Sequence, residues 1–278
     1  MTGFSADWLT LREAADHRAR SNEIAEALSA RFTQRPLLRV IDMGCGTGAN
    51  LRATAPLLPE QQTWRLIDHD SNLLAAAREC LMQWADRTAT DGDRMILEAG
   101  GKRIEVELHQ CDLNNDLDAA LGPEADLITS SAFFDLVSMP FMQRLAAAVL
   151  ARKAVFHAVL TYNGRQRWSP RHPSDNAVIA AFHRHQVRDK GFGLAAGPTA
   201  AMELADQFRA IGYSVLEGDS PWQLDTRDAA LIAELQAGHM KAVAETGAVD
   251  PKTLERWAAA KRTEVYIGHT DTLAMPLL

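Results

Sequence analysis

The chain has 278 residues, of which 47% are hydrophobic and 23% are charged, with 36 acidic side chains against 29 Lys and Arg. The formal net charge of −7 disfavours a broad phosphate-binding surface, so nucleic acid is not expected as a partner. No segment approaches the roughly 18 uninterrupted apolar residues of a membrane span, and no secretory signal pattern is present, so we expect a cytoplasmic protein without a membrane partner.

The first predicted elements are two short amphipathic helices between residues 6 and 31, where apolar side chains recur at helical spacing. Arg12, Arg18 and Arg20 lie on these helices and could reach the carboxylate of a bound ligand, because a guanidinium suits bidentate contact with a carboxylate. The alternative is a solvated helix face, where charged side chains usually lie.

A strand, a tight turn and the start of a helix are predicted at residues 38–50. An apolar run ends in Asp42, and Gly44, Gly46 and Gly48 follow at alternate positions. Glycine carries no Cβ and tolerates positive φ, so such a turn can bring its backbone against a ligand. The loop also satisfies the G-x-G-x-x-A pattern of dinucleotide-binding proteins, so on its own it predicts a nucleotide cofactor without naming it.

Three further strands follow this loop, and the first two end in an acid. The second strand ends at Asp68, which is placed to accept hydrogen bonds from ribose hydroxyls. The strand at residues 104–110 leads into Asp112, which could accept a hydrogen bond from an adenine amino group. The fourth strand, within residues 125–132, runs into small side chains that leave room for the amino-acid part of a ligand.

Together these features resemble the class I S-adenosylmethionine-dependent methyltransferases, and the resemblance covers residues 38–162 well. It implies an α/β fold: a Rossmann-like, seven-stranded, mostly parallel sheet with helices on both faces and helical lid insertions. It also implies S-adenosylmethionine as cofactor and S-adenosylhomocysteine as product. In that family the glycine loop packs on the methionine part, and the acids after strands two and three meet the ribose and the adenine. The residues that this implies for the cofactor site are Asp42, Gly44, Cys45, Gly46, Gly48, Asn50, Asp68, His69, Cys111, Asp112, Leu113, Ser130, Ser131 and Arg12.

The remaining strands are predicted from shorter patterns. A Gly-Gly pair between β-prone runs predicts a short hairpin at residues 94–104. Strand five is predicted at residues 154–161 and strand six at residues 213–216. The last strand, at residues 264–268 with a possible extension at 272–274, is expected to be antiparallel.

After Tyr162 the sequence departs from a minimal methyltransferase, and two insertions with helical spacing follow. Ligands of open α/β sheets bind at the carboxyl ends of the strands, so material added there is expected to form a substrate lid. We therefore expect one domain over residues 1–278. Its parts are cap helices at 1–36, a cofactor-binding half at 37–162, lid insertions at 163–199 and 228–262, and remaining core at 200–227 and 263–278.

The catalytic candidates are weakly signalled, because methyl transfer from a sulfonium mainly needs an aligned nucleophile and exclusion of water. Asp135, just past strand four, could orient an amine or hydroxyl, with a helix cap as the alternative. Tyr162 follows strand five and is the second candidate. One of the two histidines in the basic run 183–193 could be a base, and His185 is taken as the third candidate, with a solvated helix end as the alternative.

No metal is expected, because the three cysteines lack C-x-x-C spacing and two histidines at i and i+2 point to different helix faces. The predicted function is methyl transfer from S-adenosylmethionine to an oxygen or nitrogen of a small-molecule acceptor, by a monomer or homodimer. An NAD(P)-dependent oxidoreductase is the alternative enzyme, although it does not explain the acids at both Asp42 and Asp112. A catalytically silent cofactor-binding or partner-binding protein is the alternative from another class.

Overall fold

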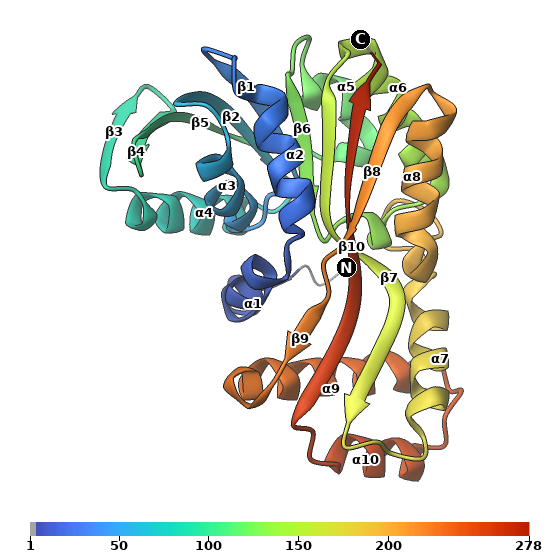
Figure 1. Cartoon of the computed structure of the whole chain (residues 1–278). Helices are drawn as coiled ribbons and strands as arrows, with labels where there is room; N and C mark the ends of the chain where they lie inside the picture. The colour runs from blue at the N-terminus through green and yellow to red at the C-terminus, as the bar shows by residue number, and fades with distance from the viewer. Residues whose placement is uncertain (1–3, 278) are drawn as a thin grey trace.

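One mixed sheet of ten strands runs through residues 4–277, the part of the chain that the computed structural model describes (Figure 1). The strand order is β3-β4-β5-β2-β1-β6-β7-β10-β8, and β9 pairs with β10. The strands are β1 (Leu38–Met43), β2 (Gln61–Asp68), β3 (Arg87–Asp91), β4 (Arg94–Ala99), β5 (Lys102–Gln110), β6 (Leu127–Ser131), β7 (Val155–Ser169), β8 (Tyr213–Asp219), β9 (Trp222–Leu224) and β10 (Glu264–Pro276). The α-helices are α1 (Ala6–Ala19), α2 (Asn22–Phe32), α3 (Ala49–Thr54), α4 (Ser71–Trp84), α5 (Leu113–Leu121), α6 (Met139–Arg152), α7 (Asp175–Gln186), α8 (Ala200–Ala210), α9 (Ala229–Ala244) and α10 (Pro251–Ala259).

Seven of these strands form the predicted core, in the order β5-β2-β1-β6-β7-β10-β8. Neighbours from β5 to β7 pair in parallel, whereas β10 is antiparallel to both β7 and β8. The prediction of a seven-stranded, mostly parallel sheet with an antiparallel last strand is therefore confirmed. The strand order reverses at β1, which places the glycine loop where open α/β sheets bind ligands.

Helices cover both faces of this core, as a mostly parallel sheet requires. On one face, apolar side chains of α2, α3 and α4 pack on the sheet, among them the fully buried Leu28, Leu51 and Leu81. On the other face α5, α6 and α8 contribute side chains such as Leu145 and Phe208 (Figure 1). The two predicted N-terminal helices are confirmed as α1 and α2.

Beyond the core, β7 and β10 continue together into a second region, which we call the strand extension: β9, the far halves of β7 and β10, and helices α7, α9 and α10 (Figure 1). The prediction that strand five ends at residue 161 is wrong, because β7 runs on to Ser169. Gly164, at φ +83°, lets the chain pass an irregularity in the pairing and re-enter the ladder with β10. Since the first part of β7 is parallel to β6, the strand extension lies beyond the carboxyl ends of the parallel strands.

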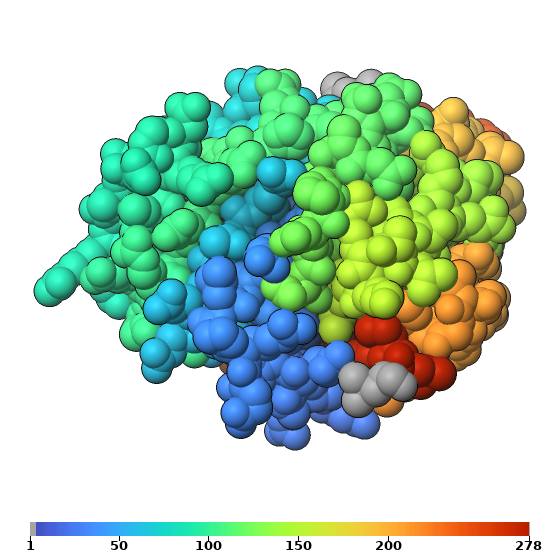
Figure 2. Space-filling view, turned by 90° about the horizontal axis from the view of Figure 1, so that it is seen from above, coloured from blue at the N-terminus to red at the C-terminus, as the bar shows by residue number. Residues whose placement is uncertain are grey.

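A side hairpin widens the other end of the sheet. The predicted turn at Gly100-Gly101 joins β4 to β5, and β3, which the sequence reading did not include, adds one more strand outside β4. Figure 2 shows this region at one end of the molecule, with α8 at the opposite end. Within residues 4–277, no helix is long and apolar enough to span a membrane, and no group of three His, Cys, Asp or Glu side chains is arranged to hold a metal ion.

Candidate cofactor and acceptor site

The glycine loop between β1 and α3 has the backbone that the sequence predicts. Gly44, Gly46 and Gly48 have φ values of +62°, +54° and +77°, in the left-handed region that favours glycine. A Cβ placed on Gly44 would lie 2.9 Å from the Phe133 ring, and one on Gly46 would lie 2.8 Å from Leu9. The loop is thus covered closely by side chains from α1 and from the segment after β6, and it has no room for a larger residue.

A cluster of buried polar side chains lies next to the glycine loop and stabilises it. Asp42, fully buried at the end of β1, accepts a hydrogen bond from Asn50 Nδ2 at 2.7 Å. The guanidinium of Arg20, between α1 and α2, donates to Asn50 Oδ1 at 2.8 Å and to Thr54 at 2.9 Å. Asp42 and Asn50 therefore link the N-terminal helices to the base of the loop.

Burial raises the pKa of Asp42 to about 7, against the lowering effects of Asn50 and Arg20. An acid whose folded-state pKa is raised keeps its proton in the folded protein after the unfolded chain has lost it. Its contribution to stability is complete below about pH 4 and is lost as the pH rises to about 7. This loss has a slope of at most about 1.4 kcal/mol per pH unit.

We predict that Asp42→Asn flattens the dependence of the unfolding free energy on pH between about pH 4 and 7. The variant retains an oxygen to accept from Asn50 and gains an amide in place of Asp42 Oδ2, which has no hydrogen-bond partner. Urea denaturation at several pH values measures the effect. Parallel curves for the two proteins would show that Asp42 does not titrate in this range.

Asp68 ties the loop to the end of β2. Its Oδ2 accepts from the Gly46 backbone N–H at 2.9 Å, and its Oδ1 accepts from the Asp70 N–H at 3.0 Å. The Asp68 side chain is nearly buried, and the exposed ring of His69 lies 3.3 Å from Oδ1. A carboxylate oxygen accepts more than one hydrogen bond, so Asp68 retains acceptor capacity for hydroxyls of a ligand beside the loop.

The next strand end carries the second acid. Asp112 caps α5, where it accepts from the Asn114 N–H at 2.9 Å and from Asn115 Nδ2 at 2.7 Å. Its neighbour Cys111 is half-buried and Leu113 is buried against the core. Because β5 pairs in parallel with β2, Asp112 and Asp68 follow adjacent strands at the same edge of the sheet.

Other predicted cofactor residues have mainly internal contacts. Ser130 Oγ donates to the Met43 carbonyl at 2.7 Å, so this hydroxyl connects β6 with β1. Cys45 is buried, and its backbone N–H donates to the Ile67 carbonyl at 2.9 Å. Ser131, the last residue of β6, is half-buried.

Arg12 lies on α1 in a closed set of contacts. It forms an ion pair with Asp16 at 2.8 Å, and its guanidinium lies 4.8 Å from the centroid of the Trp222 ring. The Trp222 indole N–H donates to the same Asp16 at 2.9 Å. These contacts fix Arg12 between α1 and β9, at the junction of the core and the strand extension.

Asp135 lies in the short 3-10 helix η2 (Phe134–Leu136), in the loop after β6. Burial raises its pKa to about 6, although the charges of Arg12 and Lys190 act in the opposite direction. Near neutral pH a carboxyl with this pKa can accept a proton or hold a polar group. The pKa of Asp135 thus responds to one cation on α1, Arg12, and to one in the loop after α7, Lys190.

Tyr162 is buried, and its hydroxyl has two partners. It lies 2.8 Å from His183 Nε2, and it accepts from Gln166 Nε2 at 2.7 Å. The indole of Trp168, which can only donate, lies 3.3 Å from Gln166 Oε1 and so fixes which end of the amide faces Tyr162. When Nε2 of His183 carries no proton, Tyr162 can donate its own proton to that nitrogen.

The structure brings His183, and not His185, to the predicted Tyr162. His185 Nε2 instead lies 3.0 Å from Glu245 Oε2 and links α7 to the end of α9. The two histidines point to different faces of α7, as their spacing predicts. The sequence indicates two histidines on this helix. It does not indicate which of them contacts Tyr162, because that contact depends on the tertiary packing.

Neither the protein-family models nor the curated protein sequences contain a match to this chain. Solved structures do match it. A cyclopropane-fatty-acyl-phospholipid synthase-like protein from Lactobacillus casei ATCC 334 has a TM-score of 0.55 and 14% identity, covering 98% of this chain and 95% of that one. The cyclopropane synthase MmaA2 from Mycobacterium tuberculosis has a TM-score of 0.53 and 13% identity, covering 98% and 94%. The chain has the class I methyltransferase fold.

Proposed function

We propose that this protein is an S-adenosylmethionine-dependent methyltransferase that acts on an oxygen or nitrogen of a small-molecule acceptor. One observation carries the proposal: Asp68 and Asp112 follow adjacent parallel strands beside a glycine loop that has no room for side chains. Acceptors at these two places suit the ribose and adenine of a nucleoside, and the close backbone suits its amino-acid part. The residues present therefore fit this cofactor.

The bound cofactor would supply a methyl group on a sulfonium, whose sulfur accepts the electrons of the breaking bond. On this proposal Asp68 holds the ribose hydroxyls with His69 beside it, and Asp112 holds the adenine amino group between Cys111 and Leu113. Ser131 and Arg12 would face the amino-acid end, with the Arg12 guanidinium shared between that end and Asp16. Asp42, Asn50, Cys45 and Ser130 hold the loop in place from behind.

On the acceptor side, we propose that Asp135 orients the reacting amine or hydroxyl and that Tyr162 contacts it. When the acceptor loses its proton, Tyr162 can take it while passing its own proton to His183, since the Tyr162 hydroxyl lies 2.8 Å from Nε2 of that ring. His183 thus takes the role that the sequence reading gave to His185, because only His183 contacts Tyr162. Closure by α1 and by parts of 163–199 and 228–262 would exclude water.

Several narrower features belong to the same proposal. A single domain with the lid insertions named above, a monomeric or homodimeric state and a cytoplasmic location are consistent with it. The alternatives are an NAD(P)-dependent oxidoreductase and a catalytically silent cofactor-binding or partner-binding protein. The oxidoreductase predicts binding of nicotinamide dinucleotide, and the silent protein predicts cofactor binding without methylation of any acceptor.

Calorimetric titration with S-adenosylhomocysteine, with NADH in parallel, tests the cofactor without the acceptor. We expect micromolar binding of S-adenosylhomocysteine alone, which would lead to an acceptor screen with labelled S-adenosylmethionine. NADH binding alone would replace the proposal by the oxidoreductase. Binding of neither compound would count against both enzyme readings.

We predict that Asp68→Ala weakens S-adenosylhomocysteine binding by about 1–3 kcal/mol, because it removes a charged acceptor from the ribose hydroxyls. Asp93→Ala is the matched control, since Asp93 is an exposed acid in the turn between β3 and β4. It should bind as tightly as the wild-type protein. Equal affinities for wild type and Asp68→Ala would remove the ribose assignment.

A further inference from the structure

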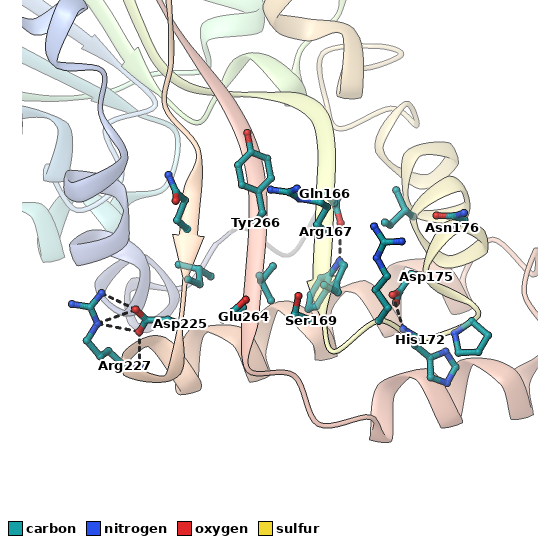
Figure 3. A pocket seen from close by; sticks show the side chains of 17 residues that line it. Gln166, Arg167, Ser169, His172, Asp175, Asn176, Asp225, Arg227, Glu264 and Tyr266 are labelled. Carbon is teal, nitrogen blue, oxygen red and sulfur yellow. Dashed lines mark hydrogen bonds and ion pairs between the residues drawn. The ribbon is translucent and has the colours of Figure 1, made fainter.

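Two cavities lie on the strand extension. They adjoin each other, have volumes of about 790 and 660 Å³, and share five lining residues on β7, β10 and α7. Figure 3 shows the residues that line the first of them. Those shared residues are Gln166, Arg167, Asn176, Ile179 and Tyr266. Each volume is in the range of small-molecule sites, and we call the two together the extension groove.

The extension groove carries cations without carboxylate partners. Arg167 and Arg171 form no ion pair with any residue in 4–277, whereas Arg227, also at the groove, is paired with Asp225 at 2.7 Å. Glu264 is an acid of the groove without a cation partner. In a chain with a net charge of −7, two unpaired guanidinium groups in one cavity favour an anionic ligand.

Arg167 packs against an aromatic ring of the neighbouring strand. It lies directly opposite Tyr266 in the pairing of β7 with β10, and its guanidinium lies 4.9 Å from the centroid of that ring (Figure 3). Stacking uses the face of a guanidinium and leaves its N–H edge free. That edge matches two oxygens of a carboxylate or phosphate.

The extension groove also reaches the proposed acceptor site. His183 lines one end of it, and the same ring lies 2.8 Å from the Tyr162 hydroxyl. A molecule whose anionic group binds at Arg167 can therefore reach His183 with its other end. This part of the groove is lined by Gly164 to Gln166 of β7 and by side chains of α7, including Ile179 and Ala180.

We propose that the extension groove binds the methyl acceptor and that the acceptor carries a carboxylate or phosphate group, held by Arg167 and Arg171. The identification of the bound molecule as a methyl acceptor rests on the proposed function. The anion site itself depends only on the groove. Binding of anion and binding of cofactor are therefore measured separately, on the same samples.

The test is calorimetric titration of the full chain with inorganic phosphate and, separately, with 4-hydroxybenzoate, each with and without saturating S-adenosylhomocysteine. We expect saturable binding of at least one anion in the millimolar range or tighter, at least tenfold weaker binding in Arg167→Gln, and no change in Arg227→Gln. Phosphate and 4-hydroxybenzoate distinguish the two anion chemistries. S-adenosylhomocysteine should bind all three proteins equally.

Three results would overturn the proposal. One is that neither anion binds saturably while S-adenosylhomocysteine does. A second is that Arg227→Gln weakens anion binding as much as Arg167→Gln, which would indicate only general attraction to positive charge. The third is displacement of the anion by S-adenosylhomocysteine, which would place it in the cofactor site. Anion binding without any S-adenosylhomocysteine binding would retain the groove as an anion site and reject the proposed function.

Discussion

Replacing Arg262 by Met is expected to lower the free energy of unfolding by roughly 3 kcal/mol, as removal of one partner from a buried ion pair does. The Arg262 side chain is fully buried, donates to Asp175 at 2.7 Å, and packs beside the Trp168 and Trp257 rings. Burial alone would raise the pKa of Asp175, but hydrogen bonds that include one from Arg262 hold it below its usual value. Met retains much of the apolar packing, so the loss measures the guanidinium group with its hydrogen bonds to Asp175 and to the Pro170 carbonyl. The figure is at the low end of the usual range because Asp175 keeps 14% of its side chain exposed.

The matched control is Arg227→Met, because the Arg227–Asp225 pair has the same 2.7 Å separation but 79% exposure of the arginine. Exposed pairs contribute little, so the control should unfold at the wild-type urea concentration. Equal destabilisation of the two variants would show that the Arg262 contact depends on charge alone and not on burial. Hydrogen exchange should show the loss of protection in Arg262→Met first in α7 and in the connection between α10 and β10, which this pair joins.

Gly44→Ala is expected to weaken S-adenosylhomocysteine binding by an order of magnitude or more. A tenfold weaker Kd corresponds to a loss of only about 1.4 kcal/mol of binding free energy, which a displaced loop is enough to cause. The new methyl would lie 2.9 Å from the Phe133 ring. That ring makes edge contacts with Phe134, Phe141 and Phe192 at 5.5 to 5.9 Å between centroids, so moving it disturbs these contacts. The new methyl therefore displaces either this ring or the loop backbone.

Gly247→Ala separates this effect from backbone strain alone. Gly247 has φ +63°, against +62° for Gly44, and a Cβ there would meet nothing within 4 Å. Both variants therefore have a similar cost of about 1–2 kcal/mol for an L-residue in the left-handed region. Only Gly44→Ala should lose cofactor affinity, and the same loss in Gly247→Ala would refute the assignment of the loop as the cofactor site.

The parts of the fold that the sequence predicts are those with a local pattern. The glycine loop and the acid at the end of β2 each follow an apolar run, so Gly44, Gly46 and Asp68 could be assigned before any contact was known. The hairpin at Gly100-Gly101 and the helices of the two insertions have similarly local signals. The seven-stranded core follows from these elements and from the resemblance.

The far half of β7 and strand β9, both in the strand extension, were not predicted, for a physical reason. Residues 165–169 follow a glycine and contain a single apolar side chain, Trp168, so they lack the pattern of a strand, and β9 has only three residues. Such segments form strands only when they pair with β10. For β7 the partner residues lie about a hundred residues further along the chain. The pairing of Tyr162 with His183, the burial of Arg262 and the extension groove depend on that same long-range packing.

The continuity of β7 and β10 also limits how the molecule can be divided. No cut between residues 162 and 169 separates the strand extension from the core without exposing unpaired N–H and C=O groups along β10. Such a truncated protein would present an open strand edge, which favours aggregation. Opening for ligand exchange must therefore come from elements joined by loops, such as α1 or α7, while the two shared strands stay in register. The same constraint applies when substrate specificity is changed by recombining this chain with another protein. Helices can be replaced, but β7 and β10 must come from the same parent chain.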